Sequence, residues 1–591
     1  MMDVPSLDSK KKQAMMSKRV SLWATGLCAL LLTASCAEPN VGERRAGVIP
    51  APVELTKGQG LFAIGPRTEI GYADESLKGM AAQLSEEIER ASGMKLAFAS
   101  DKESNCKIFL ELVDPSVFAD LPTPYGNSPT ASDPRAEFYQ LSVEKDNIYI
   151  KAPALAGMRR GIATLTQLVA QNATPAENGK LYLPLVQVKD APRFAWRGLS
   201  LDVSRCFFTV DEVKQVIDMI ARYKMNVLHM HLTDNQGWRL EIKAYPQLTE
   251  VGGRIPLKGK PVGFYTQEEF KELIAYAADR QVTIVPEVDL PGHTAAVFAA
   301  YPEMKNAVTM KLDASMAGQA LNALDVDDPK AMALTEAVVK EVAALTPGAY
   351  IHVGGDESVG LPHDKYVRYI NKVSEMVKAN GKRMAGWQET ARADIGEGDL
   401  FQHWIMMRDE SSEDFASSKE VQKQPEALRK MIKLYADFMK EAGKDPELGI
   451  SKGAKVILSP SRYVYMDMPY LEPSADSTQT DEQNRLGLQV YAKQTVADMY
   501  DWDPMTLNPT VEEPTQKVAG IEAAIWCETV SSFSDLQFLL LPRLAGVAEK
   551  GWSRVEQTAW DEYSQRLAAQ QPLWEKAGWN YFKSSMVPWQ D

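Results

Sequence analysis

Gly198-Leu-Ser-Leu-Asp-Val203 and Val227-Leu-His-Met-His-Leu232 are two short apolar runs, and the stretch Val210–Tyr223 between them fits a helix. This order is typical of a strand, a helix and a second, parallel strand. Thr209 is a suitable N-cap, and Thr266 with Glu269 predicts a capping box for a later helix. The alternation continues and gives eight predicted strands: Gly198–Val203, Val227–Leu232, Val282–Val288, Tyr350–Val353, Arg383–Gly386, Leu400–Trp404, Lys455–Leu458 and Gly520–Ile525.

Eight βα units predict an α/β fold, a TIM (β/α)8 barrel over residues 193–555. The alternative is an open, doubly wound sheet, but neither a GxGxxG motif nor a P-loop follows any of these strands. The long charged segment 406–446 interrupts the alternation, and its clearest helical part is Ala427–Met439. We interpret it as an insertion in the loop after the sixth strand, because barrel loops tolerate insertions.

Residues 47–190 predict a separate small α/β domain. Strand-like runs at Lys107–Val113, Tyr139–Val143 and Ile148–Ala152 alternate with helical stretches at Leu77–Ala91 and Ala156–Ala170. Residues 556–591 predict a helical tail that packs aromatic side chains on the barrel, among them Trp574, Trp579 and Tyr581. The chain of 591 residues is long enough for these parts.

The N-terminus predicts export. Basic residues precede an apolar run over Val20–Leu32, which is short for a membrane span and suits a signal peptide. Ala34, Ser35 and Cys36 then resemble a bacterial lipoprotein signal, with residues 1–36 containing the signal peptide, cleavage before Cys36 and a lipid on that cysteine. We therefore expect an exported protein anchored in the bacterial outer membrane or periplasm. Thr33 departs from the usual aliphatic residue, so a soluble secreted form stays open.

The composition excludes some classes of binding partner. The net charge is −14, and an acidic surface repels nucleic acid and anionic lipid, so we expect neither as a partner. Cys106, Cys206 and Cys527 are scattered and form no disulfide framework or CxxC zinc motif. His229 and His231 point the same way on a strand but lack an HExxH motif. We expect no metal and no cofactor; the oligomeric state is open.

Polar and aromatic side chains follow the predicted strands, where barrel enzymes place their reactive groups. These candidates are Asp234, Asp289, His293, Asp356, Glu357, Trp387, Trp404, Tyr465, Asp467, Trp526 and Glu528, with Arg197 in the first strand region. Aromatic faces stack on pyranose C–H groups, and carboxylates accept hydrogen bonds from hydroxyls. Any one of these residues alone is as readily explained by packing or an ion pair, but their joint position predicts a carbohydrate site.

Asp356 and Glu357 are adjacent, in His352-Val-Gly-Gly-Asp-Glu357. Glycosidases normally use two carboxylates on opposite sides of the scissile bond, and neighbours at one strand end do not readily straddle a sugar. The pair instead fits the substrate-assisted exception, in which the 2-acetamido oxygen of the substrate attacks the anomeric carbon. One carboxylate then holds the acetamido N–H, and the other is acid and then base. Alone, this motif also fits a solvated strand end.

The sequence resembles glycoside hydrolase family 20, the β-N-acetylhexosaminidases. The resemblance lies in the stretches Trp196–Arg205, His229–Trp238, Pro286–His293, His352–Glu357 and Trp526–Glu528, in the family's order. It implies that Asp356 orients the acetamido group, Glu357 is the acid/base and Tyr465 binds the acetamido oxygen. It further implies that Trp387, Trp404 and Trp526 wall the pocket, that Arg197, Asp467 and Glu528 bind ring hydroxyls, and that Asp234, Asp289 and His293 support the acid.

The expected function is therefore the removal of terminal non-reducing β-linked N-acetylglucosamine or N-acetylgalactosamine from glycans. Cys206 replaces a frequent histidine, and Val490 and Tyr491 stand where many members carry a further pocket tryptophan. These departures and the insertion affect the preferred substrate more than the reaction type. The alternatives are a surface lipoprotein that only binds glycans, which would not need Glu357, and a barrel glycosidase acting on plain hexosides.

Overall fold

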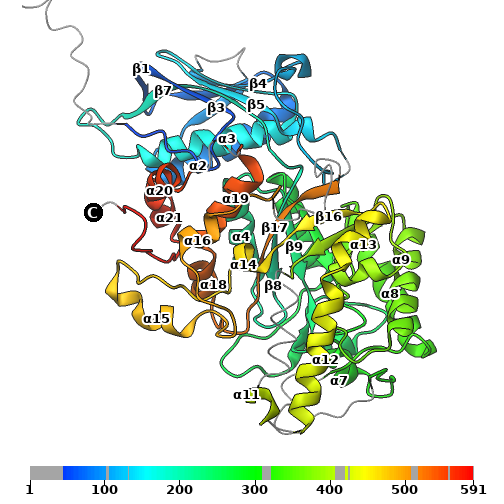
Figure 1. Ribbon diagram of the computed structural model, residues 1–591. Coiled ribbons are helices and arrows are strands. Elements are labelled where there is room, and N and C mark those ends of the chain that lie inside the picture. Colours follow the sequence, from blue (N-terminus) through cyan, green and yellow to red (C-terminus); the bar gives the residue numbers. More distant parts are fainter. Residues whose placement is uncertain are drawn as a thin grey trace, which may run out of the picture.

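The chain folds into a small α/β domain and a closed barrel (Figure 1). The computed structural model describes residues 44–100, 106–130, 132–308, 321–405, 419–423, 426–506, 517–554, 556 and 559–589. The predicted signal peptide and Cys36 lie outside these residues. Among the described helices, none combines the length and the apolar character that a membrane crossing requires.

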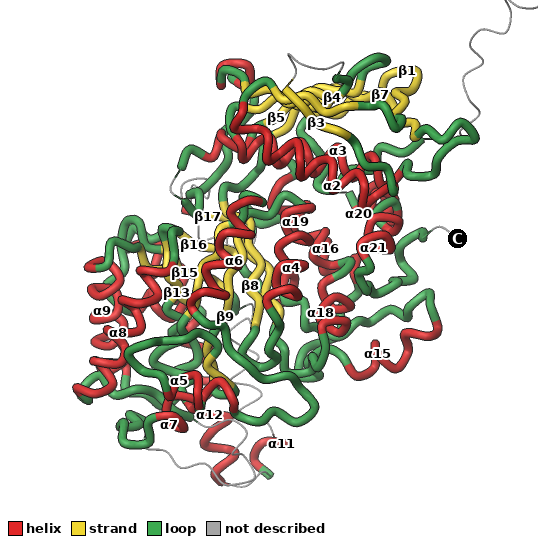
Figure 2. The backbone as a smooth tube through the Cα atoms, turned by 180° about the vertical axis from the view of Figure 1, so that it is seen from behind, coloured by secondary structure: helices red, strands yellow, loops and turns green. Residues whose placement is uncertain are grey.

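The first domain is built on one mixed sheet of seven strands. Its spatial order is β1 (Glu54–Ile64), β7 (Leu181–Asp190), β5 (Tyr139–Val143), β6 (Ile148–Ala152), β4 (Ile108–Leu112), β2 (Glu69–Tyr72) and β3 (Ala97–Ser100). Strands β5 and β6 pair antiparallel and form a hairpin, with Asp146 and Asn147 between them. Helices α2 (Lys78–Ser92) and α3 (Leu155–Gln171) cover the sheet face that is turned toward the barrel (Figure 2).

The second domain confirms the predicted TIM barrel. Eight parallel strands close on themselves, because the last strand pairs with the first. They are β8 (Trp196–Asp202), β9 (Val227–His231), β12 (Thr283–Glu287), β13 (Tyr350–His352), β14 (Arg383–Trp387), β15 (Leu400–His403), β16 (Lys455–Leu458) and β17 (Val518–Ile525). Each coincides with a strand predicted from the sequence, to within one or two residues at either end.

The outer ring of the barrel is less regular than its strands. Helix α6 (Gln267–Asp279) begins with the predicted capping box at Thr266. Helix α4 (Val210–Arg222) begins at the predicted N-cap Thr209, which also forms a capping box with Glu212. Longer helices α8 (Pro329–Leu345) and α9 (His363–Ala379) flank β13. Between β14 and β15, however, the chain forms only the 3-10 helix η6 (Gln388–Arg392).

The N-terminal end of the barrel rests on the first domain through buried ion pairs. Glu137 of the first domain accepts hydrogen bonds from Arg160 Nε at 2.8 Å and Arg197 Nη2 at 2.5 Å. Asp190 and Lys224 form a second pair at 2.9 Å, with both side chains fully buried. The first domain therefore covers only the N-terminal end of the barrel. At the opposite, C-terminal end lie the loops that follow the strands.

The insertion and the tail occupy different ends of the molecule. The insertion contains α11 (Lys419–Gln422), α12 (Glu426–Ala442) and α13 (Asp445–Ser451), of which α12 lies far from the first domain (Figure 1). The tail helices α20 (Trp560–Ala568) and α21 (Gln571–Ala577) lie at the junction of the two domains, where Trp574 Nε1 donates to Tyr223 Oη at 2.6 Å.

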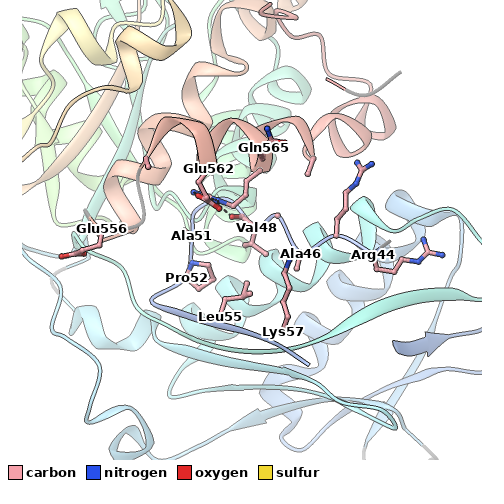
Figure 3. A pocket seen from close by; sticks show the side chains of 15 residues that line it. Arg44, Ala46, Val48, Ala51, Pro52, Leu55, Lys57, Glu556, Glu562 and Gln565 are labelled. Atoms are coloured by element: carbon pink, nitrogen blue, oxygen red, sulfur yellow. Dashed lines mark hydrogen bonds and ion pairs between the residues drawn. The ribbon is translucent and has the colours of Figure 1, made fainter. Parts of the chain in front are cut away.

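A cavity of about 590 Å³ lies between the N-terminal segment of the described chain and α20 (Figure 3). Its lining residues come from positions 44–57 and 556–569, and include Arg44, Lys57 and Glu562. None of the sequence-predicted site residues lines it. The candidate site therefore lies elsewhere, at the C-terminal ends of the barrel strands.

Candidate active site

The turn after β13 places the two adjacent carboxylates. Gly354 and Gly355 both have positive φ angles, at 67° and 93°, which glycine adopts without steric cost. A Cβ atom at position 354 would lie 1.9 Å from Asp289 Oδ1, so no side chain fits there. Glu357 itself has a φ of 42°, a conformation that non-glycine residues adopt only when the surrounding structure holds them.

His293 connects the two carboxylates. Its Nε2 atom lies 3.9 Å from Asp356 Oδ2 and 3.7 Å from Glu357 Oε2, while its Nδ1 atom lies 3.3 Å from Asp234 Oδ1. Burial opposes protonation of this ring, but Asp234 and Asp356 raise the pKa of His293 well above its usual value. The surrounding carboxylates thus favour the protonated form of His293, whose side chain is 13% exposed.

The surroundings of Asp356 disfavour its charged form. Burial and the neighbouring Asp289 raise the pKa of Asp356 well above its usual range, and its Oδ1 atom has no hydrogen-bond partner among the described residues. Asp289 is held by the amide of Gly355, and burial raises the pKa of Asp289 to about 7. An N–H donor on a ligand would satisfy Asp356 Oδ1 directly.

Arg205 anchors the cluster on the other side. Its Nη2 atom lies 2.6 Å from Asp234 Oδ2 and its Nε atom 3.5 Å from Glu528 Oε1, and its guanidinium lies 5.2 Å from the centre of the Trp526 ring. Although burial works in the opposite direction, Arg205 and His293 hold the pKa of Asp234 well below its usual value. Asp234 is therefore a fixed negative charge that orients both cations.

The prediction that Arg197 binds the sugar is wrong. Arg197 is the second residue of β8 and so lies at the N-terminal end of the barrel, where it pairs with Glu137 and stacks on Trp552. Arg205 follows the C-terminal end of the same strand and occupies the position at the site that was predicted for Arg197. The sequence could have distinguished the two arginines. Residues that follow a barrel strand lie at the face that carries the active site, whereas residues at the start of a strand lie at the opposite face.

Two of the three predicted tryptophans contact Tyr465, and the third contacts one of these two. The Tyr465 ring stacks at 6.5 Å and 9° on Trp404 and meets Trp526 edge-on at 6.0 Å, and Trp526 lies 5.7 Å from the buried Trp387. Tyr465 follows β16 after the short helix α14 (Ser461–Val464). The structure thus brings these four residues together as an aromatic enclosure beside the carboxylates.

The remaining predicted residues line the far side of this enclosure. Asp467 is buried, and neither of its carboxylate oxygens has a hydrogen-bond partner among the described residues. Burial and the nearby Glu528 raise the pKa of Asp467 well above its usual range. Tyr491 meets Tyr465 edge-on at 6.3 Å. Val490 is 81% exposed and does not form a pocket wall, so of the two residues noted there, only Tyr491 faces the site.

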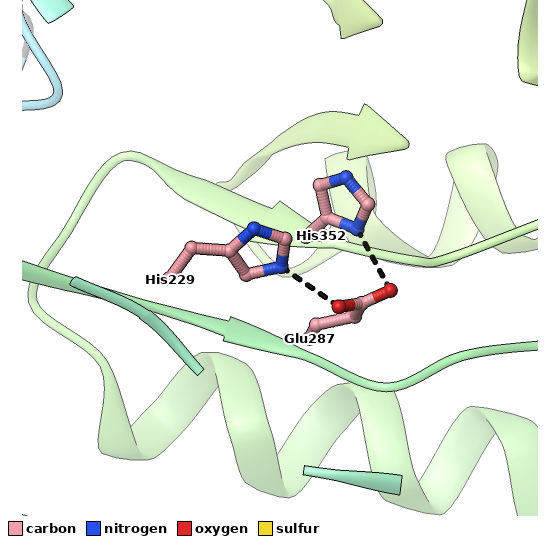
Figure 4. Close-up of side chains that lie close together, drawn as sticks. All are labelled: His229, Glu287 and His352. Carbon is pink, nitrogen blue, oxygen red and sulfur yellow. Dashed lines mark ion pairs between the residues drawn. The ribbon is translucent and has the colours of Figure 1, made fainter. Parts of the chain in front are cut away.

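A buried polar network beneath Trp387 was not predicted as part of the site. Glu287 accepts a hydrogen bond from Trp387 Nε1 at 2.7 Å and pairs with His231, His229 and His352 (Figure 4). Burial alone would raise its pKa, but the three histidines hold the pKa of Glu287 well below its usual value. The alternation of His229 and His231 on strand β9 was visible in the sequence, whereas their common partner Glu287 was not.

Histidines and carboxylates of this network also meet the spacing of metal ligands. Within the part of the chain that the structure describes, three such groups have donor atoms within 4.8 Å of one another, namely His229–Glu287–His352, His231–Asp234–Asp289 and Asp289–His293–Asp356. The first two contain hydrogen bonds and ion pairs that already account for their closeness. We assign all three to the support of the pocket, and a metal-free enzyme stays a prediction.

Glu389 is a further acid that the sequence prediction left out of the site. It follows β14, and its Oε2 atom lies 3.4 Å from Trp404 Nε1. Burial and the nearby Asp356 raise its pKa well above the usual range. Its position directly after a barrel strand could have identified Glu389 as a site residue.

Comparison with known proteins identifies this arrangement. The profile "Glycosyl hydrolase family 20, catalytic domain" matches residues 194–555, and "Glycosyl hydrolase family 20, domain 2" matches residues 45–191. The chain belongs to glycosyl hydrolase family 20. It is therefore a glycoside hydrolase, and the two matches correspond to the barrel and to the small domain before it.

Individual relatives of this family-20 chain agree with the assignment. A "Beta-N-acetylhexosaminidase" of Cellulomonas fimi is 35% identical over 77% of this chain and 82% of its own length. A "Beta-hexosaminidase" of Akkermansia muciniphila is 30% identical over 73% of this chain and 82% of its own. The solved N-acetyl-β-hexosaminidase of Streptomyces plicatus, in complex with Thio-NAglucal, has a TM-score of 0.74 at 33% identity and covers 94% of this chain and 99% of its own.

Proposed function

We propose that this chain is an exo-acting β-N-acetylhexosaminidase that releases terminal non-reducing β-linked N-acetylglucosamine or N-acetylgalactosamine from glycans. The observation that carries the proposal is the position of Asp356 and Glu357 on one strained turn, beside an aromatic enclosure that contains Tyr465. Curated relatives named β-hexosaminidases and a solved relative in complex with the product GlcNAc support it.

The proposed reaction retains the anomeric configuration. Glu357 donates a proton to the glycosidic oxygen as the acetamido oxygen attacks the anomeric carbon, and the bond to the leaving group breaks. Asp356 accepts the acetamido N–H and stabilises the positive charge of the resulting oxazolinium ion. Glu357 then removes a proton from water, which opens the ion. Tyr465 donates to the acetamido oxygen in this scheme.

The acidic cluster suits this chemistry. Asp356 is poorly charged before a ligand binds, and a positively charged intermediate beside it would favour its carboxylate form. Trp387, Trp404 and Trp526 exclude water and so strengthen that interaction. A protein that only bound glycans would need the tryptophans but not this pair of acids.

The test is the release of p-nitrophenol from its β-N-acetylglucosaminide by the wild type and by Glu357→Gln. We expect hydrolysis by the wild type and a loss of about 100- to 10,000-fold in kcat for the variant, the usual contribution of a general acid. Replacing Glu562, which lines the cavity near the tail, with Gln is the matched control and should leave kcat unchanged. A wild type that binds the sugar without cleaving it would favour the glycan-binding alternative.

We propose further that the protein is exported and anchored by a lipid on Cys36. The apolar run and the small residues before this cysteine support the proposal. Mass spectrometry of the mature N-terminus should find an acylated cysteine, and Cys36→Ser should move the protein from the membrane fraction to the soluble fraction. A mature N-terminus at another residue would contradict the anchor.

A further inference from the structure

The insertion between β15 and β16 lies beside the catalytic turn. Figure 1 places α12 at the end of the barrel opposite the first domain, and residues 358–363, which follow Glu357 in the chain, lie across from it. Leu434, Asp437 and Phe438 of α12 and these residues line a common crevice of about 330 Å³. The helix therefore borders the active site.

One face of α12 fixes it to the pocket wall. Tyr435, Phe438, Met439 and Ala442 recur at helical spacing and so share this face. Met439 and Ala442 are buried with Ile405, and both Phe438 and Trp404 pack against this group. The backbone oxygen of Ala442 accepts a hydrogen bond from Gln388 Nε2 at 2.7 Å. Lys433, on another face, is exposed.

The packing of α12 places Tyr435 within hydrogen-bonding distance of Glu357. Its hydroxyl donates to Glu357 Oε1 at 2.6 Å, while the other carboxylate oxygen, Oε2, lies 3.7 Å from His293 Nε2. The carboxylate is thus bracketed from two sides, by a histidine of the barrel and by a tyrosine of the insertion. Two fixed contacts restrict the rotation of a side chain that is otherwise 31% exposed.

The hydrogen bond also changes during the reaction. When Glu357 gives its proton to the leaving oxygen, negative charge develops on its carboxylate. A hydrogen bond to a charged acceptor is about twice as strong as one to a neutral acceptor. An interaction that strengthens toward the transition state accelerates the step, whereas uniform binding does not.

We infer that Tyr435 is a positioning residue for the general acid, which orients Glu357 and stabilises the carboxylate left when its proton is transferred. The inference rests on the proposed role of Glu357. It assigns the insertion a part in the reaction itself. Tyr435 acts through Glu357, so its effect depends on how much protonation the leaving group needs.

The test is Tyr435→Phe, which removes only the hydroxyl, assayed on two substrates. For a β-linked disaccharide of N-acetylglucosamine, whose leaving group must be protonated, we expect kcat/KM to fall about 10-fold with KM nearly unchanged. For the 2,4-dinitrophenyl glycoside, whose leaving group departs without an acid, the loss should stay below about 2-fold. Lys433→Gln on the same helix is the control and should change neither value.

Glu357→Gln, assayed in parallel, separates the two proposals. It should lose far more activity on the disaccharide than on the dinitrophenyl glycoside. If it does not, Glu357 is not the acid, and the proposed function fails in its mechanism. If Glu357→Gln behaves as expected but Tyr435→Phe loses both activities equally, or loses neither, the positioning role is overturned.

Discussion

Buried arginines pair with carboxylates at both ends of the barrel, and the two ends differ in the number of cations for each acid. At the N-terminal end, Arg197 and Arg160 both donate to the single carboxylate of Glu137, and Asn226 adds a third donor at 3.0 Å. Burial alone would raise the pKa of Glu137, but the two arginines hold it below its usual value. At this end, two cations thus share one buried carboxylate between the two domains.

At the C-terminal end, acids outnumber the cations. Arg205 and His293 satisfy Asp234, whereas burial raises the pKa values of Asp289, Asp356 and Asp467. Unbalanced buried acids destabilise a fold unless a ligand compensates them. The N-terminal end of the barrel therefore stabilises the protein, whereas the C-terminal end is suited to binding a substrate.

The largest expected effect is on stability, at the N-terminal end. Glu137→Gln leaves Arg160 and Arg197 buried without their carboxylate, and we expect the free energy of unfolding to fall by about 3–5 kcal/mol. Chemical denaturation measures this change. The kcat of the folded variant should equal that of the wild type, and a selective loss of kcat without loss of stability would break the comparison.

The same chemical change at the other end should act on catalysis. Asp356→Asn removes the charge that stabilises the oxazolinium ion, and we expect kcat to fall about 100- to 1000-fold on p-nitrophenyl N-acetylglucosaminide. The melting temperature should not fall, because the carboxyl oxygen Oδ1 has no partner among the described residues. A variant with normal kcat would mean that Asp356 does not contact the reacting acetamido group.

The two arginines can be compared directly. Arg205→Lys loses the planar fork between Asp234 and Glu528, and we expect kcat/KM to fall about 10- to 100-fold with little change in melting temperature. Arg197→Lys should show the reverse, a lower melting temperature with kcat/KM preserved. Kinetics and thermal unfolding of both purified variants check this, and equal behaviour would contradict the assigned ends.

The last expected effect is a gain of stability that depends on pH. An aspartate in an unfolded chain has a pKa of about 3.9, and burial raises the pKa of Asp289 to about 7 in the fold. The native state therefore binds more protons between these values, so this acid costs stability as pH rises from 4 to 7. Asp289→Asn should unfold at a higher temperature than the wild type at pH 8, with the advantage fading toward pH 4. An advantage that grew toward acid would contradict this sign.

The barrel and most of its candidate site could be predicted from the sequence, because both depend on the order of residues within short segments. Each strand is a short apolar run, and each reactive group follows its strand directly, as with Asp234 after β9 and Asp356 after β13. Arg197 was misplaced because the first motif contains an arginine at each end of one strand. Only the direction of that strand distinguishes their roles.

What the sequence did not reveal depends on contacts between distant residues. Tyr435 and Glu357 are brought together by the packing of α12, and Glu287 joins three histidines from two other strands. Strands β1, β2, β3 and β7 of the first domain were also not predicted. Exposed positions on β1 weaken its pattern, whereas β7 begins with a continuous buried run.

The central claim is that the 2-acetamido oxygen of the substrate is the nucleophile. It is tested most directly with p-nitrophenyl glycosides whose acetamido group carries zero, one, two or three fluorine atoms. Fluorine withdraws electrons from the amide oxygen, so we predict that kcat falls steeply with each fluorine added. A kcat that does not change across the series would show that a protein carboxylate, and not the substrate, attacks the anomeric carbon.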